Sequence, residues 1–267
     1  MALFHILLVA IVQGITEFLP ISSSGHLILL PNLLHIQDQG QVIDVAVHVG
    51  TLFAVILYFW SDLSSAILGL PRLLTGRADT PGARLALLLI ISAVPVMAAG
   101  LLLKLTGLND ALRSVAVIGW ATLIFGALLY WADQAGTTER SGEDWTMRDA
   151  ILLGLWQVIA LIPGTSRSGI TITGARLMGY ARADAARLSM LMSVPTIIAS
   201  GVLLGADAAM QANVALLRDG AIAAAFAFVA ALLALSLMMR LLRSVSFTPY
   251  VVYRLILGVA LLAIAYS

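Results

Sequence analysis

Residues 13–26 read QGITEFLPISSSGH and place a carboxylate, an imidazole and three consecutive serines between two apolar runs. Gln13 and Glu17 are four residues apart, so on a helix their side chains lie on the same face. Their oxygens are suited to a hard divalent cation whose shell is completed by water. The turn that follows adds hydroxyls and a candidate acid–base group. These candidates are Ser22, Ser23, Ser24 and His26.

A second polar stretch, PGTSRSG at residues 163–169, sets an arginine among small residues. Its glycines allow a ligand to approach the backbone closely. A helix that follows such a turn directs its free N–H groups at the turn, which favours an anion. The guanidinium of Arg167 adds a planar fork that matches phosphate oxygens. The flanking hydroxyls belong to Ser166 and Ser168. Together the two stretches predict a phosphate-sized anion pocket beside a carboxylate and an imidazole.

The chain around these stretches has the composition of an integral membrane protein. Of its 267 residues, 61% are hydrophobic and only 11% are charged, whereas soluble domains carry about 25% charged residues. The absence of cysteine excludes disulfides, thiol redox chemistry and thiolate metal sites. The net charge is +1 and there is no basic run, so no nucleic-acid partner is expected.

Six segments are long and apolar enough to cross a bilayer, which takes about 20 residues. They are 42–60, 85–103, 114–132, 188–206, 220–239 and 248–266. Two more apolar regions, 3–30 and 150–175, are interrupted by proline, glycine and polar residues. Irregular backbone at membrane depth is tolerated only where protein buries it or where it lines a wet cavity. We therefore predict an all-α polytopic protein in which both regions form re-entrant helix pairs. Ordinary kinked spans are the alternative.

The two interrupted regions match each other at an offset of 144 residues. Gln13 aligns with Gln157, and SSSG at 22–25 aligns with SRSG at 166–169. Each region is followed by three spans, and because three is odd, the second copy begins on the opposite face of the membrane. This pattern predicts an inverted-topology repeat with its site where the repeats meet. The predicted units are one membrane domain, 1–267, and its two repeats, 1–132 and 150–267.

The distribution of cations predicts the orientation, because cytoplasmic loops are enriched in Lys and Arg. With the loop at 61–84 in the cytoplasm, ten cations lie on the cytoplasmic side: Arg72, Arg77, Arg84, Arg140, Arg148, Arg176, Arg182, Arg187, Arg240 and Arg243. The outer side has three: Lys104, Arg113 and Arg218. Arg167 and Arg254 remain within apolar segments. A charge at the bilayer centre costs about 2.5–3.5 kcal/mol and usually has a function, which we expect of Arg167, whereas we expect Arg254 to snorkel or to pack against polar backbone. A buried structural pair between Glu17 and Arg167 is the alternative explanation for Arg167.

The two polar stretches resemble the motifs of the undecaprenyl-diphosphatase family, the bacitracin-resistance type of bacterial lipid phosphatase. The first motif is Glu or Gln, three residues, Glu, then a proline and a Ser-rich turn ending in Gly-His; here it reads QGITEFLPISSSGH. The second, PGxSRSGxT, reads PGTSRSGIT and ends at Thr171. This chain takes the Gln option at position 13. The resemblance extends over essentially the whole chain in length and spans. The functional residues that it implies are Gln13, Glu17, Ser22, Ser23, His26, Ser166 and Arg167.

The resemblance implies removal of the terminal phosphate from undecaprenyl diphosphate, in the bacterial cytoplasmic membrane, at a site that faces the outer side. It also implies a divalent cation, Mg²⁺ or Ca²⁺, held by Gln13 and Glu17. Phosphoryl transfer depends mainly on positioning and charge stabilisation, and the arginine and the serine-rich turns suit both. We expect Ser22, Ser24, Ser166, Ser168 and Thr171 to bind substrate. Membrane lipid is the expected surrounding partner, and a homo-oligomer is compatible with the sequence.

The sequence leaves two candidates for the nucleophile. Ser23 could attack and form a phosphoenzyme, or a water activated by Glu17 or His26 could attack directly. The lipid phosphatases of the phosphatidic-acid type need a histidine after their Ser-Arg element, and no histidine follows His48, so their mechanism is excluded. A secondary transporter or flippase with the same anion pocket is the rival function, since inverted repeats with broken helices are typical of transporters. His48 itself follows Asp44 by four residues, and a hydrogen bond within one helix explains the pair at least as well as a role near the site.

Overall fold

The computed structural model describes residues 3–34, 39–107, 112–211 and 213–267, and the regular elements in these ranges are all helical. Six helices are long and apolar enough to cross a membrane, which confirms the six predicted spans. They are α3 (Gln41–Tyr58), α5 (Pro81–Thr106), α6 (Val115–Ala135), α9 (Arg182–Gln211), α10 (Val214–Leu241) and α11 (Thr248–Tyr266). Three of them begin at a side chain that accepts a hydrogen bond from a free N–H of the first turn. These capping residues are Thr80, Ser114 and Asn213.

The two interrupted apolar regions each form a pair of short helices. The first pair is α1 (Leu3–Phe18) and α2 (Ser23–Leu34); the second is α7 (Met147–Val158), extended by the 3₁₀ turn η3 (Ile159–Leu161), and α8 (Arg167–Leu177). Ser22 and Ser166, which end the two turns, have φ angles of 73° and 71°. Positive φ is uncommon for residues other than glycine, and among the described residues these two serines are its only such cases. They occupy the same position at the 144-residue offset.

Helix α4 (Trp60–Leu74) lies where the sequence was taken to contain only a loop. The expectation was wrong because α4 is too short to span a membrane and carries Asp62 and Arg72, so a search for apolar spans passes over it. One face of α4 packs closely on α5. A Cβ on Gly69 would lie 2.3 Å from the Ala83 nitrogen, and a Cβ on Gly82 would lie 2.1 Å from the Ser65 carbonyl oxygen. The two glycines therefore allow the helices to touch through their backbones.

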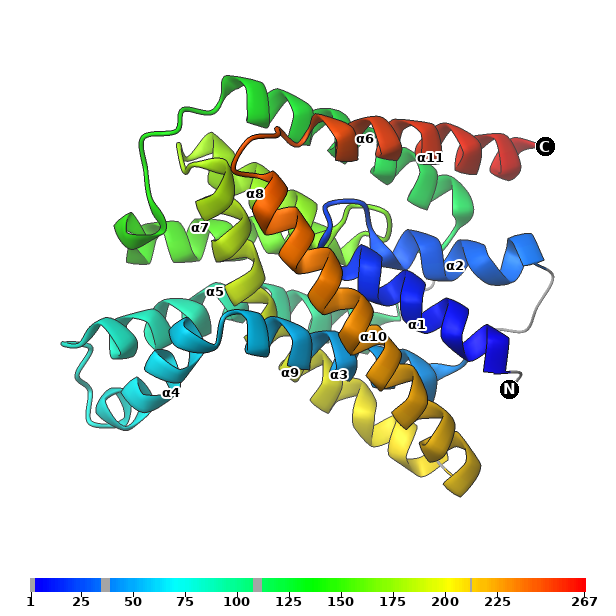
Figure 1. Ribbon diagram of the computed structural model, residues 1–267, viewed down its shortest axis with the longest axis horizontal. Coiled ribbons are helices and arrows are strands. Elements are labelled where there is room, and N and C mark those ends of the chain that lie inside the picture. The colour runs from blue at the N-terminus through cyan, green and yellow to red at the C-terminus, as the bar shows by residue number, and fades with distance from the viewer. Residues whose placement is uncertain (1–2, 35–38, 108–111, 212) are drawn as a thin grey trace.

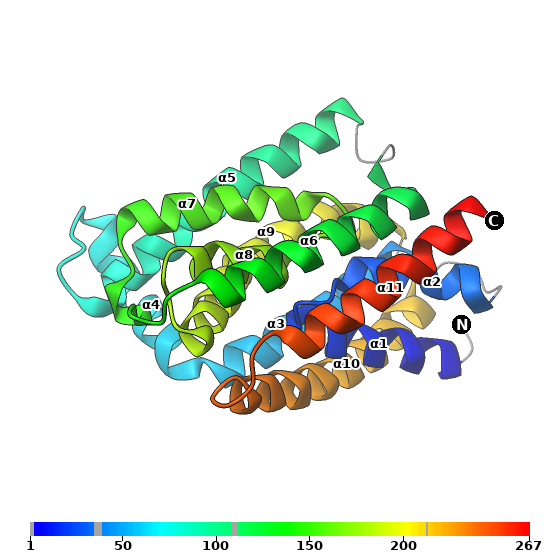
Figure 2. The same cartoon turned by 90° about the horizontal axis from the view of Figure 1, so that it is seen from above.

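The helices of the two halves of the chain pack across each other (Figures 1 and 2). Helix α1 packs on α10, while its counterpart α7 packs on α5; in the same way α3 packs on α10, and α9 packs on α5. The equivalent helices α6 and α11 pair with each other. Glycines permit two of these crossings, because a Cβ on Gly14 would lie 2.6 Å from the Cβ of Ala230, and one on Gly154 would lie 2.6 Å from the Ser92 carbonyl oxygen. Each half thus depends on the other for its packing.

Both chain termini lie at one end of the molecule, at the right of Figure 1. Helix α4, the start of α7 and the end of α10 lie at the opposite end, where most of the cations are found. Ion pairs join the helices at this opposite end. Asp133 of α6 accepts hydrogen bonds from Arg176 Nε of α8 at 3.2 Å and from Arg182 Nε of α9 at 2.7 Å. One buried carboxylate therefore joins three helices.

Asp149, in the first turn of α7, forms a second buried cluster at this end. It accepts from Arg140 Nη2 at 2.6 Å, from the Tyr180 hydroxyl at 2.9 Å and from the backbone and hydroxyl of Thr146. Burial raises the pKa of the Asp149 carboxyl, but the hydrogen bonds from Arg140, Thr146 and Tyr180 outweigh burial and lower the pKa to about 2. The carboxylate is therefore ionised throughout the physiological range.

Candidate functional site

The turns of the two helix pairs touch each other, as the sequence predicts. The Ser168 hydroxyl at the start of α8 donates to the carbonyl oxygen of Leu19 in the first turn at 3.0 Å. Arg167 Nη2 of the second turn lies 3.1 Å from Glu17 Oε1 at the end of α1. Two segments about 150 residues apart along the chain therefore form one polar site between apolar helices.

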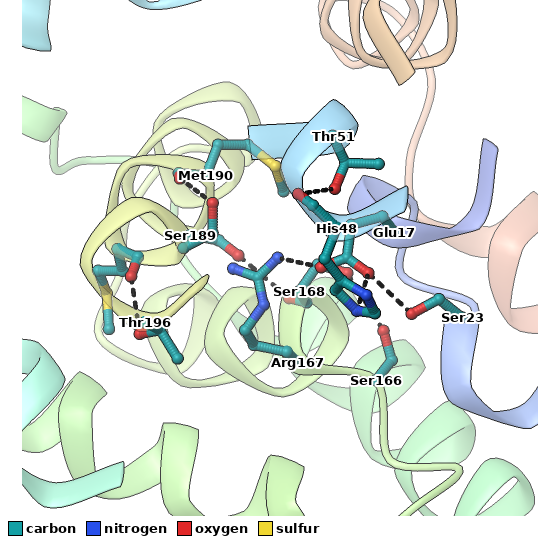
Figure 3. Close-up of polar contacts among 12 residues, drawn as sticks. Glu17, Ser23, His48, Thr51, Ser166, Arg167, Ser168, Ser189, Met190 and Thr196 are labelled. Carbon is teal, nitrogen blue, oxygen red and sulfur yellow. Dashed lines mark hydrogen bonds and ion pairs between the residues drawn. The ribbon is translucent and has the colours of Figure 1, made fainter. Parts of the chain in front are cut away.

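Glu17 is the centre of this site (Figure 3). Its side chain is buried, and both of its oxygens accept hydrogen bonds. Oε2 accepts from Gln13 Nε2 at 2.8 Å and from the Ser23 hydroxyl at 2.9 Å. Oε1 accepts from Arg167 Nη2 at 3.1 Å. A serine hydroxyl held by a carboxylate is the arrangement in which the carboxylate can take the proton as the hydroxyl attacks.

Of the two terminal nitrogens of Arg167, Nη2 donates to Glu17 and Nη1 is available to a ligand. Its Nη1 atom is buried and has no hydrogen-bond partner among the described residues. A buried donor without a partner is costly, and more so when it is charged. The free Nη1 is therefore suited to a ligand oxygen, and a guanidinium favours phosphate.

Ser23 and Arg167 occupy equivalent positions in the two halves, since 23 plus 144 is 167. Both side chains converge on Glu17, one at each oxygen. The position equivalent to Glu17 itself is Leu161. The site is thus asymmetric: the first half supplies the carboxylate and the hydroxyl, and the second half supplies the guanidinium.

The other serines build the turns in the same way in both halves. Ser22 Oγ lies 3.2 Å from Ser24 Oγ and accepts from the Gly25 N–H at 3.4 Å. Ser166 Oγ lies 3.1 Å from Ser168 Oγ and accepts from the Gly169 N–H at 3.1 Å. Three of the four serines are buried and Ser24 is exposed. Their hydroxyls shape the turns that precede α2 and α8, and the N-terminus of a helix is suited to an anion.

Thr171 lies one turn into α8 and its hydroxyl faces another helix. It donates to the Arg167 carbonyl oxygen at 2.8 Å and lies 2.6 Å from the Ser189 hydroxyl of α9. These contacts fix α8 against α9. Substrate binding by Thr171 stays a prediction.

His26 is near the turn but its contacts lie elsewhere. Its Nδ1 lies 2.7 Å from the Ser22 carbonyl oxygen and so donates to it, and its Nε2 lies 2.6 Å from the Tyr253 hydroxyl of α11. The two rings are stacked with centroids 5.7 Å apart. None of the described contacts joins His26 to Glu17 or Ser23, so an acid–base role for His26 stays a prediction.

His48, for which the sequence left open a hydrogen bond within its helix and a role near the site, makes both kinds of contact. Its Nε2 lies 3.8 Å from Glu17 Oε2, while its Nδ1 donates to the Asp44 carbonyl oxygen at 2.7 Å. The ring is half-exposed and stands at the side of the Glu17 carboxylate (Figure 3). The signal was present in the sequence, because Asp44, His48 and Thr51 form a polar stripe along one face of an apolar span.

The side-chain oxygen atoms at the site are suitable ligands for a hard divalent cation. The Oε1 atom of Gln13 is buried without a hydrogen-bond partner, beside the Glu17 carboxylate. No group of three or more His, Cys, Asp or Glu side chains suited to a metal occurs in the part of the chain that the structure describes. Mg²⁺ commonly takes one or two carboxylates together with substrate phosphates rather than a complete protein cage. The residues present therefore fit a cation that arrives with a phosphorylated substrate.

These features define an all-helical multi-pass membrane protein with a buried polar site of serines, a carboxylate and an arginine. The family model described as bacitracin resistance protein BacA matches residues 6–260. The chain belongs to this family, which agrees with the resemblance of its two motifs.

Named relatives match the chain over its full length. It is 70% identical to the undecaprenyl-diphosphatase of Ruegeria pomeroyi and 69% identical to that of Jannaschia sp.. Each alignment covers 100% of this chain and 100% of the relative. It is 47% identical to undecaprenyl-diphosphatase 1 of Rhodospirillum rubrum, over 100% of this chain and 96% of the relative.

Proposed function

We propose that this chain hydrolyses undecaprenyl diphosphate to undecaprenyl phosphate and inorganic phosphate, and so recycles the lipid carrier for cell-wall synthesis. The observation that carries the proposal is the convergence of Ser23 and Arg167 on the two oxygens of Glu17. This arrangement brings together a hydroxyl, a carboxylate that can act as a base and a guanidinium that can bind phosphate. A relative that is 70% identical over the full chain bears the name undecaprenyl-diphosphatase.

The proposed reaction begins with attack by Ser23. The terminal phosphate lies against the free Nη1 of Arg167 and the N–H groups of the two turns. Ser23 Oγ forms a bond to the terminal phosphorus, its proton passes to Glu17 Oε2, and the bond from phosphorus to the bridging oxygen breaks. Undecaprenyl phosphate leaves with the bridging oxygen. Water then attacks the phosphoserine, inorganic phosphate departs, and the proton on Glu17 returns to the serine oxygen.

Direct attack by water is the alternative course, with Glu17 or His26 taking the proton of the water. The 2.9 Å hydrogen bond between Ser23 and Glu17 favours the serine. In either course a divalent cation, Mg²⁺ or Ca²⁺, would be held by Glu17 and Gln13 and would neutralise the charge of the diphosphate. Arg167 supplies the remaining positive charge from the protein.

We further propose that the two helix pairs are re-entrant and that the halves form an inverted-topology repeat. The exchanged packing of α1 on α10 and of α7 on α5 supports it, as do the matching turns at Ser22 and Ser166. The excess of cations at the end opposite the termini supports a cytoplasmic location for that end. The first pair then enters from outside and the second from the cytoplasm. We also propose, as the family resemblance implies, that the site faces the outer side of the cytoplasmic membrane.

The test is phosphate release by the purified protein in detergent with undecaprenyl diphosphate and Mg²⁺ or Ca²⁺. We expect one inorganic phosphate for each lipid monophosphate formed. The rival function, transport of an anionic lipid or solute through the same pocket, predicts movement between the leaflets of vesicles without phosphate release. That outcome would overturn the proposal.

A further inference from the structure

Arg254 is a second arginine within an apolar helix, and the reaction proposed above leaves it without a role. It lies in α11, which is one of the six candidate spans, and its side chain is 0% exposed. The hydrogen bonds that the structure gives it go to backbone carbonyl oxygens rather than to a carboxylate. A charge buried in this way is costly and calls for an explanation.

The acceptors of Arg254 come from both turns of the site. Nη1 donates to the Pro20 carbonyl oxygen of the first turn at 3.4 Å. Nη2 donates to the carbonyl oxygens of Gly164 and Thr165 in the second turn at 3.1 and 2.8 Å. Nε donates to the Thr122 carbonyl oxygen of α6 at 3.2 Å. One rigid, planar group thus joins the first turn, the second turn and a membrane span.

The chain leaves room for this guanidinium at two glycines. A Cβ on Gly169 would lie 2.7 Å from Arg254 Nη1, and a Cβ on Gly126 would lie 3.2 Å from Arg254 Cβ and 3.3 Å from Nε. Gly169 is the glycine of the SRSG motif, so the fit to Arg254 gives a physical reason for glycine at that position. Two separate parts of the sequence therefore accommodate the same side chain.

We infer that Arg254 is a positioning residue that fixes the two turns relative to each other and thereby sets the placement of Ser23 and Arg167. Ser23 lies three residues after Pro20 of the first turn, and Arg167 lies two residues after Thr165 of the second turn. A shift of one turn against the other would move the hydroxyl and the guanidinium apart. The inference rests on the proposed phosphatase function for its kinetic consequence, while its geometric consequence is independent of that function.

The decisive variant is Arg254→Lys, which keeps the charge but loses the three-way fork. Arg176→Lys is the matched control, because Arg176 is also almost completely buried and donates to backbone carbonyl oxygens, but at the opposite end and beside Asp133. We expect Arg254→Lys to lower kcat by about 100-fold, the typical cost of displacing catalytic groups by about 1 Å. Arg176→Lys should lower thermal stability without this loss of kcat per folded molecule.

The geometry is measured separately by a distance between the turns. The chain has no cysteine, so spin labels at Leu19→Cys in the first turn and Leu161→Cys just before the second, neither of which is fully buried, report only that distance. We expect the distance distribution to broaden or shift in the Arg254→Lys background and to stay unchanged in the Arg176→Lys background. An unchanged distance in the Arg254→Lys background overturns the inference, whatever the activity, because a loss of activity would then come from local packing rather than from a shift of the turns.

A milder variant covers the case in which Arg254→Lys does not fold. Gly126→Val places a larger side chain where a Cβ alone would already lie 3.2 Å from Arg254 Cβ and 3.3 Å from Nε, so the guanidinium has to move although it is kept. The same change in the distance between the turns is expected, and its absence overturns the inference. If the wild-type protein releases no phosphate, the proposed function fails, but the distance measurement still decides the role of Arg254.

Discussion

Replacement of Arg167 by lysine should remove most of the activity although the positive charge is kept. The guanidinium uses Nη2 to hold Glu17 Oε1 at 3.1 Å and presents a buried Nη1 that has no hydrogen-bond partner in the described part of the chain. A lysine ammonium is a compact point charge and cannot serve both oxygens in this fork geometry. The variant must therefore give up either the contact with Glu17 or the contact with the phosphate.

The size of the loss follows from the hydrogen bond that is removed. A hydrogen bond to a charged group contributes about 1.5–3 kcal/mol, and about 1.4 kcal/mol corresponds to a factor of ten in rate. We therefore expect kcat/KM for undecaprenyl diphosphate to fall by about 10- to 150-fold in Arg167→Lys. Phosphate release by the purified variant measures this, with thermal unfolding as the check on folding.

A matched control is Arg187→Lys. Arg187 forms an ion pair with Asp62 of α4 at the end opposite the termini, and none of the described contacts joins its side chain to the two turns. This control should keep its kcat/KM. Near-normal kcat/KM in Arg167→Lys would show that Arg167 is a structural residue and would refute the reasoning above.

Three further predictions concern other side chains. Glu17→Gln keeps the shape but removes the charge, so turnover should collapse and the dependence on divalent cation should change; full activity with an unaltered metal titration would remove Glu17 from the site. Tyr253→Phe removes the hydroxyl that contacts His26 Nε2 and should reduce turnover only a few-fold, about 1 kcal/mol for one hydrogen bond; a loss as large as that of Glu17→Gln would place His26 in the chemistry. The pKa of Asp149 is lowered from 3.8 to about 2, so its contribution to stability is complete above pH 3.8 and is lost as pH falls through about 2. Asp149→Asn should therefore lower the melting temperature at neutral pH and flatten its decline between these two pH values; equal acid dependence of both proteins would contradict this.

The spans and the meeting of the two turns could be predicted from the sequence because the membrane restricts the options. Long apolar runs must be helices, and irregular polar backbone must be shielded by protein. The strongest sign was the repeated serine pattern, and the equal φ angles of Ser22 and Ser166 give it a structural counterpart. Helix α4 was missed because it is amphipathic and short, so no rule for membrane spans applies to it.

The partners of individual side chains could not be predicted in the same way. Ser23 and His26 are three residues apart, which suggested that the imidazole stands beside the hydroxyl. In the structure Ser23 binds Glu17, and His26 binds Tyr253, which is 227 residues away in the chain. His48 approaches Glu17 from a different span. Periodicity within one helix can show that a polar face turns inward, but which residue that face meets depends on how the helices pack.

In the proposed reaction, Glu17 activates Ser23 for attack on the terminal phosphorus. The most direct test is the stereochemical course of hydrolysis of undecaprenyl diphosphate that carries an isotopically chiral terminal phosphorothioate. Attack by Ser23 followed by attack of water comprises two in-line displacements and predicts net retention of configuration at phosphorus. Net inversion would contradict the account, because it requires a single displacement by water.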